Sequence, residues 1–378
     1  MSILPSPGPF AHWMLREIYE QPAALAATLE EYVAGAEFRA ERCAPVQAWL
    51  GRVRTKIVIA ASGSSRHAGL AGEIMIEDLS GLVVDVEYAS EYVYRAERSL
   101  PNAAVMAISQ SGETADTLAA LRKANAAGHE TLAITNVGDS TMAREATVSF
   151  PMMAGRERAV PATKSFTGQL LNLYLLALMN ARGREMLTAE ELAVRLEELA
   201  RLPGRIEAQL EGWDGRVREI AGRLGTAKNF LFLGRGLGYA IAREGALKLK
   251  ESAYVHAEGY PSGELKHGPN ALVAEGTPLV MIATVDSANP ESVERYEKVV
   301  QLMRDMREQG ASIVAIANRG DGAVGGLADH TVYVEEVREE LMAICEAIPL
   351  QLLSYWMAVN GGIDVDHPRN LTKAVLAE

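Results

Sequence analysis

The six residues from Ser109 to Thr114, Ser-Gln-Ser-Gly-Glu-Thr, bring three hydroxyl groups together directly after an apolar run, Ala103 to Ile108. This pattern is typical of a buried strand that opens through a loop into a helix, here Ala115 to Asn125. The first N–H groups of a helix lack helical partners and carry partial positive charge, so they can hold a phosphate. The residues fit an ordinary helix cap equally well, with Ser109 or Ser111 accepting hydrogen bonds from those N–H groups.

A second group of hydroxyls, Ser62, Ser64 and Ser65, follows another apolar run, Ile57 to Ala61. In open α/β sheets, ligands bind beyond the carboxyl ends of the strands, where such loops lie. Two hydroxyl loops at neighbouring strand ends can surround one phosphate monoester, because each hydroxyl can donate a hydrogen bond to a charged oxygen. The two loops together therefore favour phosphate binding more strongly than either loop alone.

Side chains that can move protons occur in the second half of the chain. The pattern from Tyr239 to Ala253 predicts a helix, and the spacing of Glu244, Lys248 and Glu251 places these three residues on one face. Spacing alone favours a solvated face, on which a Glu244–Lys248 ion pair contributes roughly a few tenths of a kcal/mol.

The segment after this helix is rich in glycine and proline and carries Glu258, Glu264, Lys266 and His267. Charges held in such a loop are more often functional than structural. Beside a carboxylate and a lysine, His267 can take or give protons near neutral pH. The polar run from Asp364 to Lys373 fits a frayed tail by composition alone.

Apolar strands alternate with amphipathic helices along most of the chain, which predicts an α/β fold with parallel sheets covered on both faces. The predicted strands are Lys56–Ala61, Leu82–Tyr88, Ala104–Ser109, Thr131–Asn136 and Thr147–Phe150, then Asn229–Leu233, Leu279–Thr284, Ser312–Ala317 and Thr331–Val334. The predicted helices are His67–Leu79, Thr114–Ala127, Thr163–Ala181, Tyr239–Ala253, Ser292–Gln309 and Leu341–Val359. Each half begins with an apolar strand and a Gly-rich turn, so we predict one fold used twice.

We expect five segments. These are a helical N-terminal arm at 1–50, a phosphate-binding domain at 51–185, a helical connector at 186–212, a second domain with the titratable helix and loop at 213–360, and a tail at 361–378 that closes the site.

Composition limits the possible functions. A net charge of -12 argues against nucleic acid or an anionic membrane as the main partner. Cys43 and Cys345 lack the spacing of a disulfide framework or a cysteine zinc site, and the first ten residues do not form a signal peptide. The two cysteines fit a reducing, cytoplasmic location. The apolar stretch Leu170–Met179 is about half the length that a bilayer needs, so we expect a buried helix there. The turn Gly234–Gly238 lacks the third glycine of a dinucleotide site, and we expect no cofactor and no metal.

These residues together resemble the sugar isomerase (SIS) family, and within it the isomerase half of the glucosamine-6-phosphate synthases. The resemblance covers nearly the whole chain in order. It rests on Glu17–Pro22, Ser109–Thr117, Glu244–Glu251, His256–Glu258, Gly263–Pro269, Asp364–Asp366 and Pro368–Leu371. It implies two tandem doubly wound, flavodoxin-like SIS domains.

The resemblance also implies roles for single residues. Ser65, Ser109, Gln110, Ser111 and Thr114 would form the phosphate site, which Ser64 extends. Glu251 would move a proton between C1 and C2 of the open-chain sugar, and His267 would open the ring, usually from the neighbouring subunit of a homodimer. Lys248 would lie at the sugar hydroxyls. Lys373 would lie near the carbonyl, where a second cation nearby would help to keep its amine neutral and nucleophilic.

Two departures from the synthases bear on the reaction. Only about fifty residues precede the first predicted strand, so we expect no glutaminase domain, and Ala162 replaces a serine that usually helps to bind the sugar. We therefore expect a glucosamine-6-phosphate deaminase/isomerase, which converts glucosamine 6-phosphate and water to fructose 6-phosphate and ammonia. A fructosamine-6-phosphate deglycase, another amino-sugar-phosphate deaminase and a non-catalytic phosphosugar sensor stay open. The short acidic arm and the presence of Lys248, Glu251, His267 and Lys373 argue against the sensor.

Overall fold

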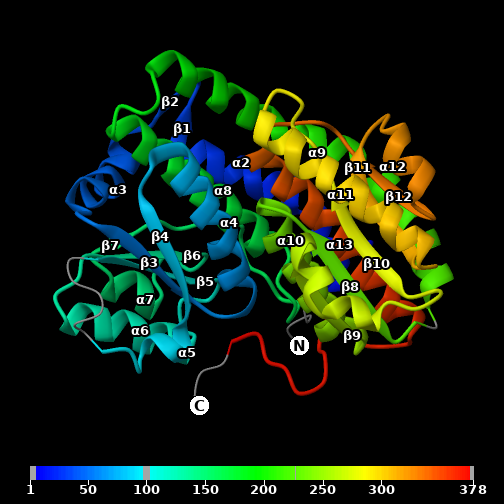
Figure 1. Cartoon of the computed structure of the whole chain (residues 1–378). Coiled ribbons are helices and arrows are strands. Elements are labelled where there is room, and N and C mark those ends of the chain that lie inside the picture. Colours follow the sequence, from blue (N-terminus) through cyan, green and yellow to red (C-terminus); the bar gives the residue numbers. More distant parts are fainter. Residues whose placement is uncertain (1–5, 97–102, 226, 375–378) are drawn as a thin grey trace. The chain divides into compact units, whose positions relative to one another are not determined.

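The computed structural model describes residues 6–96, 103–225 and 227–374, which form two compact units, each built around one parallel five-stranded sheet (Figure 1). The first-sheet unit comprises Glu20–Glu157, Lys164–Pro203 and the chain from Lys373 onward. The second-sheet unit comprises the chain up to Tyr19, Arg158–Thr163 and Gly204–Thr372. The ends of the predicted arm and tail, residues 1–5 and 375–378, lie outside the described residues.

The first-sheet unit has strand order β4-β3-β5-β6-β7, and all its neighbouring strands are parallel. Its strands are β3 (Lys56–Ala61), β4 (Val83–Tyr88), β5 (Ala104–Ser109), β6 (Thr131–Thr135) and β7 (Val148–Ser149). Its helices are α2 (Gln21–Tyr32), α3 (Ala40–Arg52), α4 (Gly63–Ser80), α5 (Ala89–Tyr92), α6 (Ala115–Ala126), α7 (Thr141–Glu145) and α8 (Lys164–Gly183). Alternate residues of β3 face opposite layers, since Val58 and Ala60 pack with α5 and α6 while Ile59 contacts Gly69 of α4.

The second-sheet unit repeats this plan with strand order β12-β11-β10-β8-β9, again all parallel. Its strands are β8 (Asn229–Gly234), β9 (His256–Pro261), β10 (Pro278–Ala283), β11 (Ser312–Asn318) and β12 (His330–Val334). Its helices are α1 (Trp13–Tyr19), α10 (Leu237–Ala253), α11 (Pro290–Glu308), α12 (Gly322–Leu327) and α13 (Glu339–Asn360), with short 3-10 helices η2 (Ser262–His267) and η3 (Pro269–Leu272). Leu231 and Leu233 pack with α11 and α12, whereas Phe232 packs with α10. The prediction of two tandem doubly wound parallel-sheet domains is confirmed.

Two regions differ from the sequence expectations. The segment from His256 to Pro261, which its composition assigned to a loop, is the edge strand β9. Its glycine is required there, because a Cβ on Gly259 would lie 2.6 Å from Arg243 Cα. Pro261 is tolerated because it ends an edge strand. The N-terminal arm is also not purely helical, since β1 (Val33–Ala34) and β2 (Glu37–Phe38) form a small hairpin in it.

One helix of the described residues, α13, is long and apolar enough to cross a membrane by length and composition, and 89% of its apolar window is buried. It packs along α10, and Gly245 of α10 closely approaches Leu350 of α13. This burial is typical of a core helix. Leu170–Met179 also lies in a buried helix, α8, as predicted.

In each sheet the chain order reverses beside the first strand, between β3 and β5 and between β8 and β10. Loops that leave neighbouring strands at such a point diverge to opposite faces, and ligands of doubly wound sheets bind in the crevice between them. The fold therefore provides one such position in each unit.

Candidate active site

The loop between β5 and α6 is braced by its own hydroxyls. Ser109 Oγ accepts a hydrogen bond from the Gly112 N–H at 3.2 Å and lies 2.9 Å from Thr114 Oγ1. Ser111 Oγ accepts from the Glu113 N–H at 3.1 Å. The N-cap residue of α6 is Thr114, and its side chain makes no capping hydrogen bond. The serines thus stabilise the loop rather than cap the helix, which leaves the start of α6 suited to an external anion.

Gly112 is required by the shape of this loop. Its φ is +65°, and a Cβ there would lie 2.1 Å from Ser140 Oγ, the hydroxyl that caps α7. We expect Gly112→Ala to lower the free energy of unfolding by about 2 to 3 kcal/mol, through backbone strain and loss of that cap. Urea unfolding of the variant measures this loss.

Gly128→Ala provides the matched control. Gly128 has a similar φ of +76°, but nothing lies within 4 Å of its added Cβ. We expect this variant to lose only about 1 kcal/mol, which is the backbone strain without the clash. Equal losses in the two variants would contradict the requirement for Gly112.

The second hydroxyl loop follows β3, next to β5 in the sheet, where Ala61 pairs with Ile108. Ser62 is the N-cap residue of α4 and makes no side-chain capping bond. Ser65 is buried, and its Oγ accepts a hydrogen bond from Gln169 Nε2 of α8 at 2.9 Å. Ser64 is half-buried. The two hydroxyl loops predicted from the sequence therefore leave adjacent strands at the reversal point of the first sheet.

A backbone hydrogen bond fixes the position of Gln110. Its carbonyl oxygen accepts a hydrogen bond from the Asn136 N–H at 3.0 Å, and its side chain is half-buried. All six predicted phosphate-binding residues thus lie in the first-sheet unit, either in the first turn of α4 or from the end of β5 to the start of α6. They are Ser64, Ser65, Ser109, Gln110, Ser111 and Thr114.

The predicted titratable face of α10 is buried rather than solvated. Glu244 and Lys248 are 2% and 1% exposed, and Lys248 Nζ lies 3.5 Å from Glu244 Oε1 and 2.5 Å from Glu251 Oε2. The face packs against α13, where Ser354 Oγ donates a hydrogen bond to the Lys248 carbonyl at 2.9 Å. The Glu251 side chain keeps 22% of its surface exposed, so this carboxylate is the most accessible member of the group. The interpretation as a solvated ion pair was wrong, because spacing identifies a face but not what covers it.

The histidine segment does not form the predicted histidine–carboxylate–lysine group. His267 ends η2, is exposed, and has no hydrogen bond or ion pair with any residue that the structure describes. Lys266 pairs instead with Asp305 of α11, with Nζ 2.5 Å from Oδ2. Glu258 accepts a hydrogen bond from the Tyr260 hydroxyl. Within the second-sheet unit, Lys248 and Glu251 therefore lie together, and His267 faces solvent.

Lys373 is held by a buried carboxylate that the sequence did not identify. Its Nζ lies 2.5 Å from Glu157 Oε2, and the Glu157 side chain is fully buried. Ser165 donates to the same carboxylate through its N–H at 3.1 Å and its hydroxyl at 2.7 Å. The expectation of a cation beside Lys373 was wrong, because the neighbouring group is the carboxylate of Glu157. Glu157 lies in an irregular segment between β7 and α8, where no periodicity marks a buried side chain.

A model of the SIS domain family matches residues 52–179 and 224–361, the two segments that contain the two sheets. The chain belongs to the SIS domain family. The matches leave out the first fifty residues, the region of α9 (Ala189–Leu224) and the C-terminal segment. Lys373 therefore lies outside the two matched SIS domains.

Similar proteins refine this assignment. The chain is 41% identical over 373 residues to a glutamine–fructose-6-phosphate aminotransferase (isomerizing) of Chlorobaculum tepidum. The aligned region covers 98% of this chain and 59% of that protein. The C-terminal domain of glucosamine-fructose-6-phosphate aminotransferase from Francisella tularensis superimposes with a TM-score of 0.89 at 34% identity, over 97% of this chain and 100% of that one. A glucosamine-6-phosphate deaminase of Thermotoga maritima shares the fold alone, with a TM-score of 0.70 at 23% identity over 96% and 99% of the two chains.

The chain thus spans about 60% of the length of the curated relatives that it matches. It corresponds to the C-terminal SIS part of the aminotransferases, and this confirms the family resemblance drawn from the sequence.

Proposed function

We propose that this protein converts glucosamine 6-phosphate and water to fructose 6-phosphate and ammonia. The observation that carries the proposal is the buried group on α10, in which an accessible carboxylate, Glu251, is fixed 2.5 Å from the shielded ammonium of Lys248. A fixed carboxylate beside a cation suits proton transfer through an enol-type intermediate, whose developing charge the cation stabilises. The identity to enzymes named as isomerizing aminotransferases of fructose 6-phosphate supports this substrate class.

The proposed reaction has four steps. The hydroxyl loops of Ser109 and Ser65 and the starts of α4 and α6 bind the phosphate, and His267 assists ring opening. Glu251 then removes the C2 proton of the open-chain amino aldehyde and returns a proton to C1, which leaves an imine at C2. Water adds to that imine, and its C–N bond breaks to give the C2 ketone and ammonia. The phosphate-binding residues and the residues that move protons must act on the same substrate molecule. They can come from one chain or from two chains.

Lys373 has a narrower role in this proposal. Its ammonium is paired with the buried Glu157, which fixes the position of the lysine tail. We propose that it lies near C2 of the substrate, where transfer of its proton to Glu157 frees the amine to add to the C2 imine and release ammonia. Water then adds to this lysine Schiff base in place of the substrate imine, and its C–N bond breaks to give the C2 ketone and free Lys373. The buried carboxylate therefore acts both as its anchor and as the acceptor of its proton.

Isomerisation in the opposite direction is a second candidate, favoured by the aminotransferase relatives. The same residues would then add ammonia to fructose 6-phosphate, since each step above is reversible. Three incubations distinguish the candidates. Ammonia and fructose 6-phosphate from glucosamine 6-phosphate alone support the deaminase. Glucosamine 6-phosphate formed from fructose 6-phosphate and ammonium supports synthesis, and activity only on fructosamine 6-phosphate supports a deglycase.

We further propose that the protein acts in the cytoplasm as a homodimer in which His267 enters the site of the partner chain. The exposure of His267 and its lack of a partner among the described residues support this arrangement. We expect an inactive Glu251→Gln chain and an inactive His267→Ala chain to regain activity when they are unfolded and refolded together. In a one-to-one mixture, half of the dimers are hybrids with one intact site each, so about a quarter of the wild-type rate should return. No recovery, or a fully active monomer, would contradict the shared site.

A further inference from the structure

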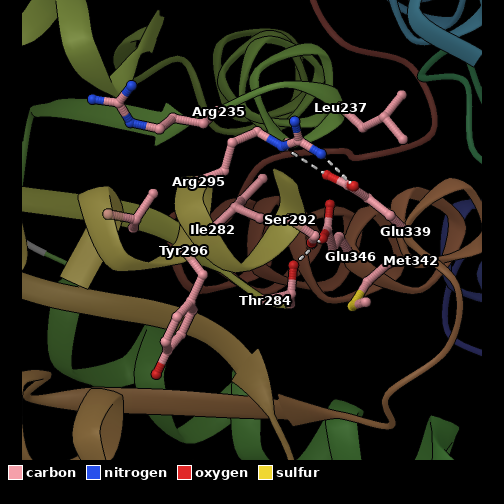
Figure 2. A pocket seen from close by; sticks show the side chains of 12 residues that line it. Arg235, Leu237, Ile282, Thr284, Ser292, Arg295, Tyr296, Glu339, Met342 and Glu346 are labelled. Carbon is pink, nitrogen blue, oxygen red and sulfur yellow. Dashed lines mark hydrogen bonds and ion pairs between the residues drawn. The ribbon is translucent and has the colours of Figure 1, made fainter. Parts of the chain in front are cut away.

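The reversal point of the second sheet, between β8 and β10, also carries a pocket (Figure 2). The space that it encloses is about 20 Å³, which holds about one water-sized molecule. Its polar lining is Arg235 after β8, Thr284 after β10, Ser292, Arg295 and Tyr296 on α11, and Glu339 and Glu346 on α13. The proposed reaction uses none of these residues.

Glu346 has an unsatisfied oxygen in this pocket. The side chain is 3% exposed, its Oε1 accepts a hydrogen bond from Thr284 Oγ1, and its Oε2 has no hydrogen-bond partner. Figure 2 shows the dashed line that joins its carboxylate to Thr284. A buried carboxylate oxygen without a donor costs free energy, so a ligand that donates to this atom would be favoured. Arg235 Nε also lacks a hydrogen-bond partner, but it is a donor and needs an acceptor instead.

Neither Arg295 nor Arg235 forms an ion pair with Glu346. Arg295 is bound to Glu339 through two hydrogen bonds, Nε to Oε1 at 3.1 Å and Nη2 to Oε2 at 2.5 Å. Figure 2 shows the Arg235 guanidinium turned away from the carboxylates, and its Nη2 would lie 3.3 Å from a Cβ on Gly263. Because both guanidinium groups are directed elsewhere, an ionised Glu346 has no positive partner among the pocket's own residues.

We propose that this pocket binds an ammonium group, either the free ammonium ion or the head of a primary amine. Its N–H groups can donate to Glu346 Oε2 and to the lone pairs of the Thr284 and Ser292 hydroxyls. A divalent cation needs about six oxygen ligands, and no group of three His, Cys, Asp or Glu side chains among the described residues is arranged to hold a metal. This inference does not depend on the proposed reaction, because binding can be measured without a phosphosugar.

Binding should be coupled to the proton of Glu346. Burial and the nearby Glu339 raise the pKa of Glu346 to about 7, against the opposing hydrogen bond from Thr284. Burial also raises the pKa of the neighbouring Glu339, against its hydrogen bond with Arg295, and raises the thiol pKa of Cys345 to about 12. The ionised fraction of a group with this pKa rises from about a tenth at pH 6 to about nine-tenths at pH 8, so the apparent affinity should rise about tenfold.

The experiment measures melting temperature and proton release in the full chain with ammonium, ethylammonium, potassium or tetramethylammonium chloride at equal ionic strength. We expect ammonium to raise the melting temperature relative to tetramethylammonium, and to release about half a proton per chain at pH 7. An added effect of ethylammonium would identify a primary-amine ligand, whereas ammonium alone would identify the free ion.

Glu346→Gln should lose both the ammonium-specific rise in melting temperature and the proton release, whereas Glu308→Gln, which changes an exposed carboxylate on α11, should keep them. Thr284→Val provides a second variant that weakens the site if Glu346→Gln fails to fold. Equal changes in melting temperature and proton release with all four salts, or with ammonium and potassium, would overturn the proposal. The pocket would then hold only water.

Discussion

Glu251→Gln should lower kcat for the proposed phosphosugar reaction by about 10³-fold while leaving phosphosugar binding close to normal. The substitution removes the one accessible carboxylate of the α10 group, and general-base catalysis contributes about 10² to 10⁴ in rate. Binding should persist because the loops proposed to bind the phosphate lie on other elements. Steady-state kinetics and calorimetric titration with fructose 6-phosphate measure the two effects separately.

Glu297→Gln, which changes an exposed carboxylate on α11, is the matched control and should keep the wild-type rate. Lys248 keeps its pair with Glu244 in the Glu251→Gln variant, so the fold of α10 should be retained. A near-normal rate in Glu251→Gln would remove this residue from the role of base.

Lys248→Met should lower the free energy of unfolding by about 3 kcal/mol or more. The substitution removes a cation that is 1% exposed and leaves Glu244, itself 2% exposed, without the ammonium beside it. Loss of one partner from a buried ion pair costs about 3 to 5 kcal/mol, because a desolvated charge remains. Urea unfolding monitored by circular dichroism measures the change.

Two further variants test this explanation. Lys266→Met breaks an ion pair with Asp305 whose lysine is 58% exposed, and exposed pairs contribute about 0 to 1 kcal/mol, so a small loss is expected. Glu244→Gln combined with Lys248→Met removes both charges and should recover part of the stability. If Lys248→Met lowers the free energy of unfolding by no more than Lys266→Met does, then burial of Glu244, Lys248 and Glu251 does not explain the contribution of their ion pairs to stability.

Local sequence determines much of this fold. The strands β3 and β5 begin and end where the apolar runs Lys56–Ala61 and Ala104–Ser109 predict, because both are buried on two faces and bounded by polar residues. The edge strand β9 was missed for the opposite reason. It pairs only with β8, so its sequence keeps polar residues, a glycine and a proline that are typical of loops.

The site was predictable where one local pattern defines it. The hydroxyl loops follow from residues adjacent in sequence, and their strands are neighbours as expected. The burial of Lys248 depends on α13, about a hundred residues further along the chain, and the pairing of Lys373 with Glu157 joins positions 216 residues apart. No periodicity encodes such contacts, so the spacing of Glu244 and Lys248 indicated a shared face but not its burial.

Ammonia release from glucosamine 6-phosphate, supplied as the sole substrate, tests the central claim most directly. We expect one ammonia and one fructose 6-phosphate for each glucosamine 6-phosphate consumed, at a rate about 10³-fold lower in the Glu251→Gln chain. Intact glucosamine 6-phosphate after incubation with a protein that still binds phosphosugars would contradict it.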